Sequence, residues 1–299
     1  MLGYAFTFLQ LFTFTLLSPI QSFNNLALPI SGFFIVIKGM SRFDILTNVL
    51  HKSENLYHYK LDLHQADDAF DQLKQSKKTI IIYNHIGWND FLVSMQMLSK
   101  VERLNDLRWI AWKGLENKLS KPVLSRLETL LLSQKPEEDK EAIRAYVDKY
   151  QDKDASFALT VFPEGGLLGK ENYLRCKNVM ETKIGHIFSN MCTPYSGAVS
   201  QLLNAFPDAD LFDVTIKYFD DAGSGDAING DYIGDWYSVK NVALYGYAPD
   251  VVSASIRRLE RPEEDTDIRK WLNDVWVEKE EILESMLDPR KKEQKTSKL

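Results

Sequence analysis

With 299 residues, 44% of them apolar and 26% charged, the chain is long enough for one large α/β domain or two small ones. Its net charge of −6 argues against a dedicated nucleic-acid-binding protein, although seven Lys/Arg against three Asp/Glu at positions 100–126 favour an anionic ligand there. Cys176 and Cys192 form neither a disulfide framework nor a metal-ligand spacing, and no glycine-rich phosphate loop is present. Nucleotide hydrolysis, hydride transfer and a nucleic-acid partner are therefore not expected.

The N-terminal segment carries no charged residue before Lys38 and contains two apolar blocks, Met1–Leu17 and Leu26–Ile37. As a helix the first block would be about 26 Å long, slightly short of a hydrocarbon core of about 30 Å. A cleaved signal peptide or a buried core hairpin fits less well, because no basic region comes first and apolar sequence continues far along. We expect residues 1–40 to be a membrane anchor, as one span or a shallow hairpin, with the following residues on the cytoplasmic side.

Beyond the anchor, helical and strand patterns alternate, which predicts an α/β fold: a mixed, largely parallel sheet flanked by helices. One expected strand begins at Thr79, and the others cover Arg108–Trp112, Ser156–Phe162, Val214–Tyr218 and Val251–Leu259. The expected helices cover Ala66–Lys77, Asp90–Lys100, the region 113–155 and about Thr266–Leu287. The last helix is amphipathic and should pack on the sheet, although its two tryptophans also permit a membrane-surface role. Residues 41–288 thus form one domain, followed by a polar tail, 289–299.

A histidine follows the first of these strands directly. The stretch TIIIYNHIGWND at 79–90 changes abruptly from β-branched residues to Asn84-His85, with Asp90 five residues after the histidine. In a turn or first helical turn, that offset can return the carboxylate to the imidazole, where it fixes the tautomer and leaves the other ring nitrogen to accept a proton. The pattern indicates a general base, but a His/Asp pair at this spacing is expected by chance roughly 0.4 times in a chain of this composition.

A second polar motif ends another strand. Phe162-Pro163-Glu164-Gly165 follows SFALTVF, and the carboxyl ends of parallel strands open onto one edge of the sheet, where ligands bind. The alternative is a plain strand-to-helix turn with Glu164 near a helix N-terminus. By composition this tetrapeptide is far rarer than the His/Asp pair.

In this order the two motifs, NHxxxxD and FPEG, resemble those of the glycerolipid acyltransferase family, the 1-acylglycerol-3-phosphate acyltransferases and their lysophospholipid relatives. The resemblance covers about residues 75–287. Its further segments look like the lysocardiolipin-acyltransferase branch: Lys113, Lys135 with Asp139-Lys140, TPYSG at 193–197, LFDVTIKY at 211–218 and WLNDVWVEKEEIL at 271–283.

The resemblance implies that His85 takes the proton from a free glycerol hydroxyl, which attacks the carbonyl of an acyl thioester, while Asp90 orients the histidine. Asn84, Pro163, Glu164 and Gly165 would shape the acceptor site. The implied co-substrate is acyl-CoA or acyl carrier protein, the implied acceptor is a lysophospholipid, and no metal or other cofactor is expected. The implied location is the bacterial inner membrane or the endoplasmic reticulum; the ending Ser297–Leu299 also matches a peroxisomal address, which we take as coincidental.

The chain also departs from the family pattern. Gly166-Leu167 replaces the usual Thr and phosphate-binding Arg after FPEG, and the upstream motif ends in Lys135 instead of Arg. A lysine lacks the bidentate fork, so phosphate recognition could rest on Lys113, Lys135, Lys170 or Arg175. Lysophosphatidic acid is the default acceptor, with lysophosphatidylglycerol, lysocardiolipin or lysophosphatidylinositol as alternatives. There are two other hypotheses. One is a hydrolase whose metal is held by His85, Asp90 and Glu164, and the other is a catalytically weak lipid-binding homologue.

Overall fold

The structure, a computed structural model, describes residues 40–56, 60–117, 120–150, 152, 154–220, 227–238, 241–242 and 247–290. The expected membrane anchor and the C-terminal tripeptide lie outside these residues. Among the residues that are described, no helix is long and apolar enough to cross a bilayer.

Strands and helices alternate along the described chain. The strands are β1 (Lys60–Gln65), β2 (Lys78–Tyr83), β3 (Leu107–Trp112), β4 (Leu130–Leu132), β5 (Phe157–Val161), β6 (Asp210–Phe219) and β7 (Val251–Leu259). The α-helices are α3 (Arg42–Leu56), α4 (Ala69–Gln75), α5 (Asp90–Lys100), α6 (Lys121–Arg126), α7 (Pro136–Tyr150), α8 (Lys170–Val179), α9 (Ser196–Ala205), α10 (Ile233–Trp236) and α12 (Ile268–Ser285). Short 3₁₀ turns cover Leu104–Asp106, Lys113–Leu115 and Ala227–Asn229, and a π-helical turn covers Met180–Ile184.

The strands form a seven-stranded sheet in the order β1-β7-β6-β2-β5-β3-β4. All neighbouring strands pair in parallel except β6 and β7, which are antiparallel. The predicted α/β class with a mixed, largely parallel sheet flanked by helices is therefore confirmed. Strand β2 lies at the centre, and all six of its residues are buried because helices cover both faces.

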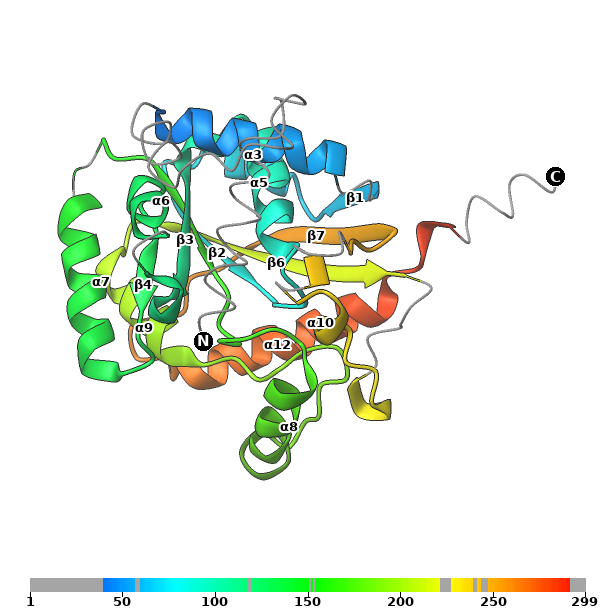
Figure 1. Ribbon diagram of the computed structural model, residues 1–299. Coiled ribbons are helices and arrows are strands. Elements are labelled where there is room, and N and C mark those ends of the chain that lie inside the picture. Colours follow the sequence, from blue (N-terminus) through cyan, green and yellow to red (C-terminus); the bar gives the residue numbers. More distant parts are fainter. Residues whose placement is uncertain are drawn as a thin grey trace.

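Helices α3, α4 and α5 pack on one face of the sheet, and α7, α9 and α12 pack on the other (Figure 1). Helix α12 buries an apolar stripe that includes Leu272, Val275 and Leu283, and the side chain of Asp267 caps its first turn by accepting the backbone N–H groups of residues 269 and 270. Trp276 on this stripe is fully buried. The prediction that the last helix packs on the sheet is confirmed.

Most predicted elements match the structure, and two strands were missed. Helix α5 and strand β7 have the predicted bounds, and β3, β5 and β6 overlap their predicted ranges. The helical interpretation of residues 113–155 was incomplete, because β4 lies within that range between α6 and α7. Three residues are too few to show a periodicity, and only pairing with β3 makes them a strand. Strand β1 was also missed, since it is held at the sheet edge by β7 alone.

Candidate active site

The two sequence motifs meet at one edge of the sheet. Strands β2 and β5 are parallel neighbours, with Ile82 opposite Val161, so the loops that follow them emerge side by side. The ring of His85 lies over that of Phe162, with 4.3 Å between the ring centroids. The expectation that both motifs open onto the same edge is thus confirmed, and β2 and β5 supply a rigid base for both loops.

His85 and Asp90 are hydrogen-bonded. The distance from His85 Nδ1 to Asp90 Oδ2 is 2.8 Å, and Asp90 is the first residue of α5, where the helix dipole favours a negative charge. The ring donates from Nδ1 to the buried carboxylate, so the neutral imidazole has its lone pair on Nε2. The histidine side chain is 22% exposed, and Nε2 has no hydrogen-bond partner within the described part of the chain.

Backbone and side-chain donors surround the Asp90 carboxylate, which is fully buried. Oδ2 also accepts the N–H groups of Ile86 at 2.7 Å and Gly87 at 3.1 Å, while Oδ1 accepts the hydroxyl of Tyr218 at 2.5 Å. These bonds hold the turn between β2 and α5 closed around the carboxylate. The aspartate therefore keeps one orientation, with Oδ2 aimed at the imidazole.

Glu164 joins two loops beneath the histidine. Its side chain is fully buried; Oε1 accepts the backbone N–H of His85 at 3.1 Å and Oε2 that of Cys192 at 3.0 Å. Burial raises the pKa of this carboxyl well above its usual value, a larger effect than the lowering by the two backbone donors. Glu164 thus fixes the backbone position of His85.

The rest of the FPEG loop turns sharply against a third segment. Gly165 has φ +67°, a left-handed conformation that favours glycine, and its carbonyl accepts Nε2 of Gln134 at 3.5 Å. The carbonyl of Pro163, which is buried, accepts the N–H of Tyr195 at 2.9 Å. The loop is consequently held between the end of β4 and the start of α9.

Asn84 lies in the sheet rather than in the opening. It is fully buried, its Nδ2 donates to the carbonyl of Ile216 at 2.8 Å, and its Oδ1 accepts the N–H of Ile216 at 2.7 Å. The amide therefore extends the pairing of β2 with β6 by one residue. A direct contact between Asn84 and substrate stays a prediction.

Lys113 and Lys135 follow β3 and β4, so both lie at the same sheet edge as His85. Their side chains are 56% and 71% exposed and share one carboxylate: Lys135 Nζ is 2.7 Å from Glu138 Oε1, and Lys113 Nζ is 4.0 Å from Glu138 Oε2. Gln134, which precedes Lys135, contacts Gly165. The structure thus brings these two lysines together beside the FPEG loop.

Lys170 and Arg175 lie on α8, the helix that follows the FPEG loop. Both are exposed, and the guanidinium of Arg175 donates to Asn172 Oδ1 on the same helix. Among the four basic residues considered from the sequence, the structure therefore distinguishes a paired set from two residues on a separate helix.

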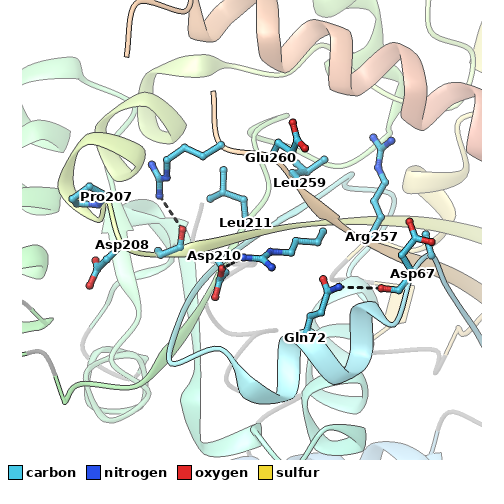
Figure 2. A pocket seen from close by; sticks show the side chains of 13 residues that line it. Asp67, Gln72, Pro207, Asp208, Asp210, Leu211, Arg257, Leu259 and Glu260 are labelled. Carbon is cyan, nitrogen blue, oxygen red and sulfur yellow. Dashed lines mark hydrogen bonds and ion pairs between the residues drawn. The ribbon is translucent and has the colours of Figure 1, made fainter. Parts of the chain in front are cut away.

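A cavity of about 610 Å³ lies at the other end of the central strands, near the start of β2 (Figure 2). Its lining includes Asp210, which is opposite Thr79 at the start of β2, whereas His85 follows the end of that strand. Two of its arginines form ion pairs, Arg258 with Asp210 at 2.5 Å and Arg257 with Asp213 at 3.0 Å. The His/Asp pair is therefore not part of this cavity.

The carboxylates at the candidate site are not arranged as metal ligands. Both oxygens of Asp90 and both of Glu164 accept N–H or O–H groups of the protein. In the part of the chain that the structure describes, no group of three His, Cys, Asp or Glu side chains is placed to hold a metal ion.

A His/Asp pair with a fully buried aspartate and an FPEG loop thus meet where two parallel strands of an α/β sheet end. Comparison with known proteins shows the class of protein. The family model described as "Acyltransferase" matches residues 51–216, more than half of the chain. The chain belongs to the Acyltransferase family. The resemblance inferred from the two motifs is thereby confirmed.

Two fungal relatives support the same assignment. One, named an uncharacterized acyltransferase of Saccharomyces cerevisiae, is 28% identical over 46% of this chain and 35% of its own length. The other, named an uncharacterized acyltransferase of Schizosaccharomyces pombe, is 23% identical over 71% of this chain and 61% of its own length. The chain thus spans about one third to three fifths of these relatives.

Sequence reasoning did not identify several residues that build the site. The hydroxyl of Tyr218 on β6 donates to Asp90, and the backbone N–H of Cys192 donates to Glu164. Gly234 of α10 packs against the backbone of Ile86 and Leu168. Each lies between about 28 and 150 positions from the residue it contacts, so no local spacing connects them. Tyr218 falls within the segment 211–218 that carried part of the family resemblance, which was the one available signal.

Proposed function

We propose that this protein transfers a fatty acyl group from an acyl thioester, acyl-CoA or acyl carrier protein, to the free hydroxyl of a lysophospholipid. The default acceptor is lysophosphatidic acid, with phosphatidic acid as product. One observation carries the proposal: His85 Nδ1 bonds to the buried Asp90 carboxylate at 2.8 Å, which leaves Nε2 as the proton acceptor at a partly exposed position.

The chemistry follows from this pair. Nε2 of His85 takes the acceptor hydroxyl's proton as its oxygen attacks the thioester carbonyl, and the tetrahedral intermediate expels the thiolate, which regains the proton from the imidazolium. The negative charge of Asp90 stabilises the imidazolium, and no serine nucleophile is required because the acceptor alcohol attacks directly. General base catalysis of this kind contributes about 10²–10⁴-fold to a rate.

The acceptor headgroup is assigned to the Lys113–Lys135 pair. The two ammonium groups and the Glu138 carboxylate together leave one net positive charge beside the FPEG loop. A phosphate would replace Glu138 as the partner of one or both lysines, with the point-charge recognition typical of lysine. Because a bidentate guanidinium is missing after FPEG, lysophosphatidylglycerol, lysocardiolipin and lysophosphatidylinositol stay alternative acceptors.

The uncharged N-terminal segment supports a membrane location. Residues 1–40 would anchor the protein in the bacterial inner membrane or the endoplasmic reticulum, with the catalytic domain on the cytoplasmic side, so that lysophospholipid reaches His85 from the bilayer. The bilayer, the lysophospholipid and the acyl thioester are then the expected partners, and no nucleic acid is involved.

The test uses the purified full-length chain in lipid vesicles, supplied with acyl-CoA or acyl carrier protein and a panel of lysophospholipids. Released thiol and diacyl product are measured together. His85→Ala should lower the transfer rate by at least about 10²-fold. The matched control is His64→Ala, because His64 also pairs with an aspartate, Asp62 at 3.0 Å, but lies exposed on edge strand β1.

Three results would contradict the proposal. Near wild-type transfer by His85→Ala would remove the base from the mechanism. Thioester hydrolysis that needs a divalent ion and no acceptor would favour the metal-dependent hydrolase. Lysolipid binding without thiol release from either donor would favour the weak lipid-binding homologue.

A further inference from the structure

The Asp90 carboxylate receives a hydrogen bond from a strand outside its own motif. Tyr218 on β6 is 2% exposed, and its hydroxyl donates to Asp90 Oδ1 at 2.5 Å. The other oxygen, Oδ2, accepts from His85, Ile86 and Gly87. The tyrosine is therefore the donor that engages the oxygen facing away from the histidine.

The sheet places Tyr218 at this position. Strands β2 and β6 are parallel, with Tyr83 opposite Val214, and the amide of Asn84 then binds the backbone of Ile216. Alternate residues of a strand share a face, so Tyr218 lies one step further along the same face as Ile216, level with the turn that carries Asp90. The two Asn84–Ile216 bonds thus continue the β2–β6 register to the position where the Tyr218 hydroxyl meets Asp90.

The turn is shaped to admit the tyrosine ring. A Cβ on Gly87 would lie 3.1 Å from Cε2 of Tyr218 and 2.7 Å from Cβ of Tyr237, whose ring packs edge-on against that of Tyr218 at 5.2 Å. Trp88 N–H also donates to the carbonyl of Tyr237 at 2.8 Å. Glycine at position 87 therefore allows both tyrosines to close over the turn.

The Tyr218 hydroxyl is the hydrogen-bond partner of a buried carboxylate oxygen. Oδ1 is buried, and an unpartnered buried carboxylate oxygen would rotate toward any other donor. A hydrogen bond from Tyr218 satisfies Oδ1 and holds the carboxylate plane so that Oδ2 faces Nδ1 of His85.

We propose that Tyr218 is a positioning residue for the His85–Asp90 pair, acting through its hydrogen bond to Asp90 Oδ1. The inference rests on the proposed general-base function of that pair. Tyr218 lies two residues beyond the family match, which ends at residue 216, so the hydroxyl is supplied by a part of the chain outside the matched region.

Tyr218→Phe tests the inference, with Tyr83→Phe as the matched control. Tyr83 is a fully buried tyrosine on β2 whose hydroxyl has no hydrogen-bond partner in the described residues, so its removal leaves the Asp90 bonds intact. In the acyl-transfer assay kcat of Tyr218→Phe should fall about tenfold, with the KM values of donor and acceptor within about twofold of wild type. Tyr83→Phe should retain wild-type kcat.

A spectroscopic measurement makes the result independent of the choice of substrates. Proton NMR of the full-length chain in detergent micelles should show a low-field signal from the His85 Nδ1 proton, identified by its loss in His85→Ala. The signal should move in Tyr218→Phe, because Oδ1 then lacks its donor, and stay in place in Tyr83→Phe. Thermal unfolding shows whether each variant is folded. If Tyr218→Phe is not folded, 3-fluorotyrosine at position 218 replaces it, since it retains the ring and the hydroxyl and makes the hydroxyl a stronger donor.

The outcomes separate the two proposals. A moved signal together with a lower kcat supports the role of Tyr218. An unmoved signal, or a loss of stability with unchanged kcat, overturns it. If wild type transfers no acyl group with any donor and acceptor, the proposed function fails and the position of the NMR signal alone decides whether Tyr218 positions the pair.

Discussion

Gly234→Ala should displace the loop that carries His85 and Ile86, although Gly234 is remote from that loop in sequence. Gly234 lies in α10, and its N–H donates to the carbonyl of Leu168 at 2.9 Å, while the N–H of Leu168 donates to the carbonyl of His85 at 3.0 Å. A Cβ at position 234 would lie 2.5 Å from the carbonyl carbon of Leu168, 2.6 Å from the Ile86 oxygen and 2.7 Å from the Leu168 oxygen. All three are backbone atoms, so no side chain can rotate away.

The magnitude follows from these distances. Ordinary contact of a Cβ begins at 3.4 Å, so the segments must separate by 0.7 to 0.9 Å, from 3.4 − 2.7 and 3.4 − 2.5. Overpacking of this kind costs about 1–3 kcal/mol, and a misplacement near 1 Å at a reacting group costs about 10²-fold in rate. We expect the free energy of unfolding to fall by about 2 kcal/mol, Tm to fall by on the order of 4–8 °C, and kcat to fall about 10- to 100-fold.

Gly197→Ala is the control. Gly197 lies near the start of α9, where an added Cβ would meet no atom within 4 Å and φ is not positive, so alanine should stabilise the helix by about 0.4–1 kcal/mol. Thermal unfolding and initial transfer rates of both variants are compared with wild type. Equal Tm values for the two variants, or wild-type kcat in Gly234→Ala, would refute the link between α10 and the His85 loop.

Two further predictions concern the acceptor site and the buried glutamate. Lys135→Ala should raise the KM for the acceptor about three- to tenfold at low salt, with kcat retained. Lys140→Ala, on the exposed side of α7, is the control and should leave this KM unchanged. Equal effects of the two substitutions would remove Lys135 from the headgroup site. Because burial raises the Glu164 pKa above its ordinary value of 4.5, the stability from its neutral form is fully present below that value and declines as pH rises toward the folded pKa. The free energy of unfolding of Glu164→Gln should therefore be about 1 kcal/mol lower than that of wild type at pH 5. In chemical denaturation, this difference between the two proteins should become smaller by pH 8. A difference in unfolding free energy that does not change with pH would contradict the raised pKa of Glu164.

The alternation of apolar runs and helical patterns was sufficient for the fold class and for most elements. Strand β2 is a run of isoleucines because both its faces are covered, and α5 starts at an acidic residue whose charge suits a helix N-terminus. Strands β1 and β4 could not be predicted, because a short edge strand is defined by its neighbour and not by its own residues.

Local sequence patterns predicted that the two polar motifs follow strand ends, and the five-residue spacing allowed His85 to pair with Asp90 across a turn. The surroundings of that pair come from tertiary contacts. Tyr218 binds Asp90, Glu164 binds both His85 and Cys192, and Asn84 serves the sheet instead of the opening. These contacts join residues that are distant along the chain, so they depend on strand order and register, which local sequence patterns do not encode.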